Sequence, residues 1–250
     1  MNTITHKPII ETTSFSLHVM AMIFMLCDHL WATFLTNQEW LTCIGRLTFP
    51  IFAFLIVEGY FHTSNLKRYV QRLLCFAIIS EIPFNLVLGG GVLYPYHQNV
   101  LWTFLIGIGL IWLNEKAKKT DKLWVRALTA VSTLCLGFIL GILTMVDYHG
   151  GGVLMVLVFY FFHGRKWWCY LGQLVSMIYI HWELFGGLSY EIEFGGTTFF
   201  LVQQGIAVLA LVPIWMYRGT QGYHSKAFQY FCYGFYPGHL LVLGLLMKCI

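Results

Sequence analysis

Residues 41–61 read LTCIGRLTFPIFAFLIVEGYF, an apolar run interrupted by one Arg and one Glu. A helix needs about 20 mostly apolar residues to cross the hydrocarbon core of a bilayer, so this run predicts a membrane-spanning helix. The rest of the chain has the same character: 58% of its 250 residues are hydrophobic and 10% are charged, whereas soluble domains are about 25% charged. The sequence therefore predicts an integral membrane protein and excludes a soluble domain, a disordered chain and a soluble nucleic-acid binder.

Similar apolar runs recur along the whole chain, which predicts an all-α, polytopic helical bundle of about nine transmembrane helices. No long hydrophilic stretch separates the runs, so we expect a single transmembrane domain over residues 1–250. The sixth run is short for a complete crossing. The expected spans are residues 17–36, 41–61, 69–89, 98–114, 125–146, 151–163, 167–185, 198–217 and 228–247.

Lys and Arg residues gather on one side of this predicted bundle. Cytoplasmic loops of membrane proteins carry an excess of Lys and Arg, so we expect this side, and the N-terminus with it, to face the cytoplasm. The exceptions are Arg46, inside the second span, and Lys248 near the end of the chain. The basic side comprises Lys7, Lys67, Arg68, Arg72, Lys116, Lys118, Lys119, Lys122, Arg126, Arg165, Lys166, Arg218 and Lys226.

Asp28, His29 and Arg46 form one group of ionisable residues inside the first two spans, where each charge costs about 2.5–3.5 kcal/mol on insertion scales. Asp28 and His29 are adjacent in the first span and therefore point in different directions. The second span runs back through the membrane, so Arg46 is expected at the depth of Asp28 and is its best partner. Two interpretations stay open for this group: an ion pair that joins two helices, or a catalytic or proton-handling site.

A second polar group is expected in the outer half of the bundle. Glu81 and Asn85 are four residues apart on one face of the third span, and Pro83 between them frees a backbone carbonyl. Gln98 and Asn99 begin the fourth span at the same level, and Asp147 and Tyr148 end the fifth, although these could also be interfacial caps. His239 lies beside a predicted kink in the ninth span, whereas Glu58 is expected near the inner face.

Several motifs resemble, in sequence order, the TraX family, membrane proteins named for acetylation of F-type conjugative pilin. The resemblance extends over nearly the whole chain and, more loosely, to transmembrane acyltransferases. The motifs are MLCDH at 25–29, GRLTFPIFAF at 45–54, VEGYFHT at 57–63, SEIPF at 80–84, QNV at 98–100, DYHG at 147–150 and FYPGHL at 235–240.

The resemblance implies an acetyltransferase of the bacterial cytoplasmic (inner) membrane. Such an enzyme moves an acetyl group from cytoplasmic acetyl-CoA to an amine or hydroxyl on the outer side. The implied acceptor is a pilin-like peptide, a glycan or a lipid head group, and no nucleic acid is involved. The chain itself leaves the acceptor open.

On this interpretation His29 is the expected general base, and Arg46 either pairs with Asp28 or stabilises the oxyanion. No metal ion is expected. The residues expected to bind substrate are Glu58, Glu81, Asn85, Gln98, Asn99, Asp147, Tyr148 and His239, and those expected to bind the CoA phosphates are Lys67, Arg68 and Arg72.

Two other functions fit the same residues. In a proton-coupled transporter or channel, the intramembrane carboxylates and histidines would relay protons or bind a solute, although the chain has no convincing internal repeat of the transporter kind. In a non-catalytic assembly factor for a secretion or conjugation system, none of the intramembrane charges would be needed for chemistry.

Overall fold

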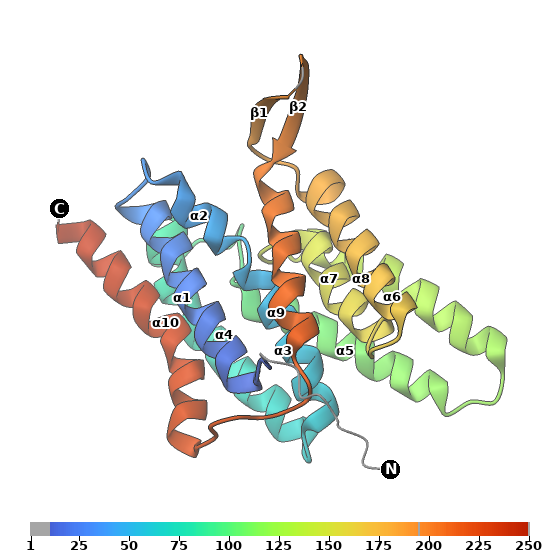
Figure 1. Ribbon diagram of the computed structural model, residues 1–250. Helices are drawn as coiled ribbons and strands as arrows, with labels where there is room; N and C mark the ends of the chain where they lie inside the picture. Colours follow the sequence, from blue (N-terminus) through green and yellow to red (C-terminus); the bar gives the residue numbers. More distant parts are fainter. Residues whose placement is uncertain (1–10, 195, 250) are drawn as a thin grey trace, which may run out of the picture.

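The computed structural model describes residues 11–194 and 196–249, which form a mostly helical bundle (Figure 1). A two-stranded β-hairpin, β1 (Ser189–Phe194) and β2 (Thr197–Val202), projects from the top of the bundle in this view. The helices are α1 (Ser14–Thr33), α2 (Glu39–Gly45), α3 (Thr48–His62), α4 (Leu66–Leu88), α5 (Val100–Lys118), α6 (Leu123–Leu143), α7 (His149–Phe161), α8 (Trp167–Tyr179), the π-helix η1 (Ile180–Phe185), the 3₁₀-helix η2 (Gln203–Ala210), α9 (Leu211–Met216) and α10 (Lys226–Cys249).

Six helical segments are long and apolar enough to cross a membrane: α1, α2 with α3, α4, α5, α6 and α10. The helices at the remaining expected spans are shorter, and α7 has only 13 residues, as its sequence predicted. The chain is therefore a helical membrane protein.

The all-α prediction is wrong for the segment before η2. Residues 197–202 read TTFFLV, and the expected span 198–217 began within them. These residues pair antiparallel with β1, so that Thr197 lies opposite Phe194 and Val202 opposite Ser189. Phe, Leu and Val are hydrophobic, but Thr, Phe and Val are also enriched in strands, so hydropathy alone did not distinguish a span from a strand.

The expected span over 41–61 is confirmed by the apolar segment Glu39–His62, although its helix is interrupted between Gly45 and Thr48. Pro50 lies in the first turn of α3, where its missing N–H leaves no hydrogen bond unmade. In an unbroken helix, Pro50 would instead face the carbonyl of Arg46. The break gives Arg46 a position at the junction of two helices.

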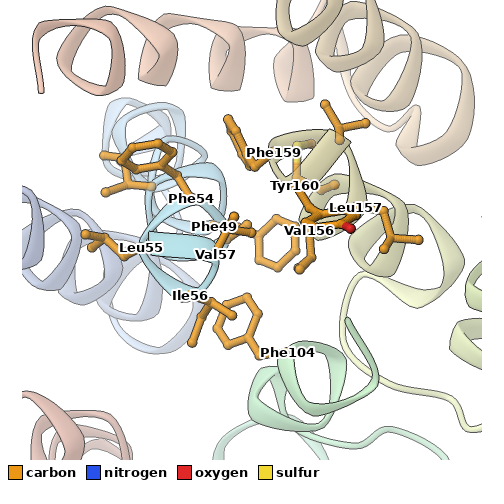
Figure 2. Close-up of a cluster of buried hydrophobic side chains, with 14 of the residues drawn as sticks. Phe49, Phe54, Leu55, Ile56, Val57, Phe104, Val156, Leu157, Phe159 and Tyr160 are labelled. Atoms are coloured by element: carbon orange, nitrogen blue, oxygen red, sulfur yellow. The ribbon is translucent and has the colours of Figure 1, made fainter. Parts of the chain in front are cut away.

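Helix α3 lies at the centre of the bundle and is buried along most of its length. Figure 2 shows its side chains, among them Phe49, Phe54 and Val57, together with Phe159 of α7 and Phe104 of α5. Helix α1 contacts α3 and also α10, and α10 packs along α4. A second apolar cluster fills that space: Met25, Phe84, Val87, Tyr236, Leu240 and Leu243.

The two ends of the bundle differ in charge. The start of α1, the end of α9 and the start of α10 meet at one end, drawn at the bottom of Figure 1, where Ser14 N donates to Thr220 O at 2.9 Å. We call this the basic end, because Lys67, Arg68, Arg165, Arg218 and Lys226 belong to its helix ends and loops. Lys7, which the sequence assigned to the same side, lies outside the described residues.

Candidate functional site

Two histidines from opposite ends of the chain form the centre of the site. His29 Nδ1 of α1 lies 2.6 Å from His239 Nε2 of α10, and His239 Nδ1 lies 2.6 Å from the Phe235 carbonyl oxygen. A carbonyl oxygen only accepts, so His239 Nδ1 carries a hydrogen, and its Nε2, when neutral, accepts from His29 Nδ1. This assignment leaves the lone pair on His29 Nε2, to which no described residue donates. The pair therefore presents an oriented base.

Asp28 and Arg46 form the pair that the sequence predicted. Arg46 Nη2 lies 3.4 Å from Asp28 Oδ1, and Thr42 Oγ1 donates to the same Oδ1 at 2.8 Å while accepting from Arg46. Gly45 makes room for this group, since a Cβ there would lie 2.5 Å from Asp28 Oδ1. Asp28 therefore pairs with Arg46 and Thr42, whereas the partner of His29 is His239.

Arg46 keeps one unused donor. Its Nε is buried and has no hydrogen-bond partner among the described residues. The site therefore combines a free lone pair with a free cationic N–H.

Glu81 joins α4 to the start of α5. Its Oε1 accepts from Trp102 Nε1 at 2.6 Å, from Asn99 N at 3.3 Å and from Asn99 Nδ2. Asn99 also donates to the Ala77 carbonyl at 2.8 Å and caps α5 through Leu101 N at 3.1 Å. The predicted proximity of Glu81 and Asn99 is confirmed. Their hydrogen bonds hold helix α4 against the start of helix α5.

The loop before α7 contributes Asp147 and Tyr148. Asp147 Oδ1 lies 3.3 Å from His97 Nε2, and this hydrogen bond raises the pKa of His97 above its ordinary value. Tyr148, which has a left-handed backbone (φ 59°), stacks on Phe49 with ring centroids 4.0 Å apart. This stacking places the loop against the first turn of α3, close to Arg46 in sequence.

Two predicted residues lie apart from the histidine pair. Asn85 is buried, with its Nδ2 3.4 Å from the Val92 carbonyl, and its Oδ1 has no partner among the described residues. Gln98 turns its side chain to the Pro95 carbonyl at 2.8 Å. The backbone of Gln98 still matters, because it pairs with Met145 and Asp147 and so ties the start of α5 to the loop before α7.

A cavity of about 480 Å³ connects the basic end with the neighbourhood of the histidine pair. Helices rise about 1.5 Å per residue, so the cavity extends about 16 Å along α1 from Ser14 to Met25. Met25 lies one helical turn before His29, and the Tyr236 ring, also in the cavity wall, lies 6.5 Å from the His29 ring. The end of the cavity that is lined by Met25 and Tyr236 therefore lies near His29.

Glu58 belongs to the basic end and not to the histidine pair. Its Oε1 lies 2.7 Å from His163 Nε2, and its Oε2 lies 3.7 Å from His62 Nδ1. Glu58 lines both the larger cavity and a second one of about 200 Å³.

The three basic residues predicted to bind CoA line neither of these cavities. Lys67 and Arg68 are exposed in the first turn of α4, and Arg72 has a buried Nε with no hydrogen-bond partner among the described residues. Within residues 11–194 and 196–249, no group of three or more His, Cys, Asp or Glu is arranged to hold a metal ion.

Sequence reasoning missed several contributors. Thr42, His97 and Trp102 bind predicted site residues through partners that no local pattern specifies. Each is a polar or amphipathic residue within a few positions of a predicted site residue in the sequence. This closeness in sequence was the one feature that could have identified them. His163 follows α7 at the basic end and had no such signal.

The chain matches the family model described as "TraX protein" over residues 15–247. It is also 42% identical over 79 residues to a protein of Dichelobacter nodosus named "Probable fimbrial assembly protein FimC, serogroup H1", a match that covers 30% of this chain and 32% of that protein. The chain thus spans about a third of the curated relative that it matches, and no solved structure matches it. Because the family model covers nearly the whole chain, this protein belongs to the TraX family.

Proposed function

We propose that this protein is an acetyltransferase that uses acetyl-CoA as donor and an amine or hydroxyl as acceptor. The observation that carries the proposal is the unpaired Nε2 of His29, whose ring lies 6.5 Å from the ring of Tyr236 in the wall of a 480 Å³ cavity. A base that is oriented by a second group and lies within reach of a substrate is the arrangement that general base catalysis requires.

In the proposed reaction, His29 Nε2 takes the proton of the acceptor as its nitrogen or oxygen attacks the thioester carbonyl carbon. The resulting oxyanion is stabilised by the free N–H of Arg46. Collapse of the intermediate breaks the carbon–sulfur bond, and the thiolate takes the proton from His29. The products are the acetylated acceptor and CoA, and His29 returns to its starting state.

His239 and Asp28 have positioning roles in this scheme. His239 holds the Nδ1 hydrogen of His29 and so keeps the lone pair on Nε2. Asp28 and Thr42 hold one arm of the Arg46 guanidinium, so that its Nε keeps a fixed direction. Glu81 and Asn99 fix the start of α5, which contributes Val100 and Leu101 to the cavity wall.

The proposal includes a bacterial inner-membrane location, nine crossings and an N-terminus inside. The gathering of Lys and Arg at one end of the bundle supports this orientation. The donor then enters from the cytoplasm at the basic end, and the acceptor approaches from the hairpin end. The relative's name, a fimbrial assembly protein, favours a pilin-like peptide over a glycan or a lipid head group.

The test is acetyl transfer by the purified full-length protein in proteoliposomes supplied with labelled acetyl-CoA. General bases contribute about 10²- to 10⁴-fold, so His29→Ala should lose at least about a hundredfold in kcat. His149→Ala is the matched control, because His149 is exposed at the start of α7. Full activity in folded His29→Ala protein would overturn the mechanism.

The acceptor is identified by mass spectrometry of envelope material with and without the gene. The expected result is a lost acetyl group on an envelope component. If deletion of the gene abolishes pilus assembly without changing any acetyl group, and wild-type and His29→Ala protein restore assembly equally, the protein is an assembly factor without this activity.

A further inference from the structure

The second cavity, of about 200 Å³, lies at the basic end between α3, α8 and α9. Three aromatic side chains, Tyr170, Trp215 and Tyr217, form much of its wall, and Arg165 contributes a guanidinium. No residue predicted from the sequence accounts for this cavity, apart from Glu58 in its wall.

The aromatic wall is held in place by hydrogen bonds. Trp215 Nε1 donates to Gln173 Oε1 at 2.7 Å, and Gln173 Nε2 donates to the Phe162 carbonyl at 2.9 Å. The Tyr170 and Trp215 rings meet edge to face with centroids 5.2 Å apart. Fixed aromatic surfaces of this kind bind planar ring systems, and stacking a nucleic-acid base on such a ring contributes about 1–3 kcal/mol.

The charge of the cavity suits an anion at its mouth. Glu58, the one carboxylate in its wall, is engaged with His163 at 2.7 Å. Arg165 Nη2 donates to the Tyr217 carbonyl at 3.3 Å, and this is the one hydrogen bond that its side chain makes to a described residue. A guanidinium has five N–H donors, so Arg165 has others for phosphate oxygens, and Lys166 is its neighbour in sequence.

The two cavities share Glu58, His62, Tyr217 and Gly219 in their walls. The larger cavity has no Lys or Arg among its described lining residues, so it suits an uncharged arm and not a phosphate. The smaller cavity has both an aromatic wall and a cation, so it suits a nucleotide.

We propose that the smaller cavity binds the nucleotide end of the acetyl-CoA donor. The adenine ring lies against the aromatic wall formed by Tyr170, Trp215 and Tyr217, and Arg165 binds the phosphates. The uncharged pantetheine arm then follows the larger cavity to His29. This inference rests on the proposed function, and it assigns the phosphates to Arg165 in place of Lys67, Arg68 and Arg72.

The test is equilibrium binding to the full-length protein in nanodiscs, with CoA, adenosine diphosphate and pantetheine as separate probes. Arg165→Gln removes the cation and Tyr170→Leu removes one aromatic ring. Losing a hydrogen bond to a charged group typically weakens binding about tenfold or more, and we expect this loss for CoA and for adenosine diphosphate. Pantetheine binding should not change in Arg165→Gln.

Arg126→Gln is the matched control, because Arg126 is an exposed residue on α6 that bonds only the Thr120 carbonyl among the described residues. It should bind all three probes as the wild type does. Arg165→Lys should recover part of the affinity that Arg165→Gln loses, since it restores the charge without the guanidinium geometry.

The outcomes separate this inference from the proposed function. Acetyl transfer with an unchanged KM for acetyl-CoA in both Arg165→Gln and Tyr170→Leu overturns the nucleotide site and leaves the acetyltransferase standing. Arg165-dependent binding of adenosine diphosphate without acetyl transfer supports a nucleotide site and overturns the proposed donor. Failure of the wild type to bind CoA or adenosine diphosphate overturns both.

Discussion

Replacing His239 with Leu removes the group that holds the Nδ1 hydrogen of His29. The two nitrogens are 2.6 Å apart, and the other nitrogen of His239 is anchored on the Phe235 carbonyl. Without this acceptor, His29 either keeps an unpaired donor inside the bundle or adopts the other tautomer, which has no lone pair on Nε2. An unpaired buried donor costs about 1–3 kcal/mol.

At 1.36 kcal/mol per tenfold change in rate, that cost corresponds to a loss of about 5- to 150-fold in kcat for His239→Leu. The KM for acetyl-CoA should stay the same, because His239 is not among the residues that line the donor cavity. The assay is acetyl transfer in proteoliposomes over a range of acetyl-CoA concentrations, which separates kcat from KM.

His239→Gln is the informative companion variant. Its amide oxygen can accept the same hydrogen from His29, so it should recover most of the activity that His239→Leu loses. Thermal unfolding in detergent checks that both variants fold. Wild-type kcat in His239→Leu, or an equal loss in the Gln and Leu variants when both are folded, refutes the assigned tautomer.

Three further predictions concern the packing, the loops and the cavity. Gly45→Ala should lower stability by about 1–3 kcal/mol, as overpacking does, because its Cβ meets Asp28; thermal unfolding measures this. The raised pKa of His97 means that its pair with Asp147 stabilises the fold fully below about pH 6.5, the ordinary His value, and that this contribution is lost as pH rises through the raised pKa. Leu55→Trp, which fills the larger cavity, should raise the KM for acetyl-CoA about tenfold or more if the lost contacts are worth 1.4 kcal/mol or more.

Each of these predictions has its own control. Gly109→Ala should not lower stability, because a Cβ at Gly109 meets no atom within 4 Å and Ala is favoured over Gly inside a helix such as α5. Asp147→Asn should flatten the dependence of unfolding temperature on pH near the His97 transition. Leu128→Trp, at an exposed position on α6, should leave the KM as in the wild type.

Hydropathy predicted most of the helices, and it failed where an apolar segment could also form a β-strand. Residues 197–202 are apolar enough for a membrane and β-prone enough for a strand, and their pairing with β1 decided between the two. The break before α3 did have a signal, since Pro50 follows Arg46 by four residues. That spacing is the one at which proline removes a helical hydrogen bond.

The site was predictable where partners lie on consecutive helices. Asp28 and Arg46 follow one another across a single turn, so their depths could be matched from residue counts, and the pair forms. His29 and His239 are 210 positions apart, and their contact depends on α10 returning beside α1, which no count along the chain gives. The cavities depend on side-chain packing and were beyond sequence reasoning for the same reason.

The intramembrane polar groups differ in how completely they are paired, and this difference bears on function. Glu81 accepts hydrogen bonds from Asn99 and Trp102, and Asp28 accepts one from Thr42 and forms an ion pair with Arg46, so their cost of burial is offset within the fold, as expected for groups that hold helices together. His29 Nε2 and Arg46 Nε have no such partner among the described residues. A purely structural ion pair gives no reason for an unpaired base on His29 and an unpaired donor on Arg46, whereas a reaction that moves a proton and forms an oxyanion needs both.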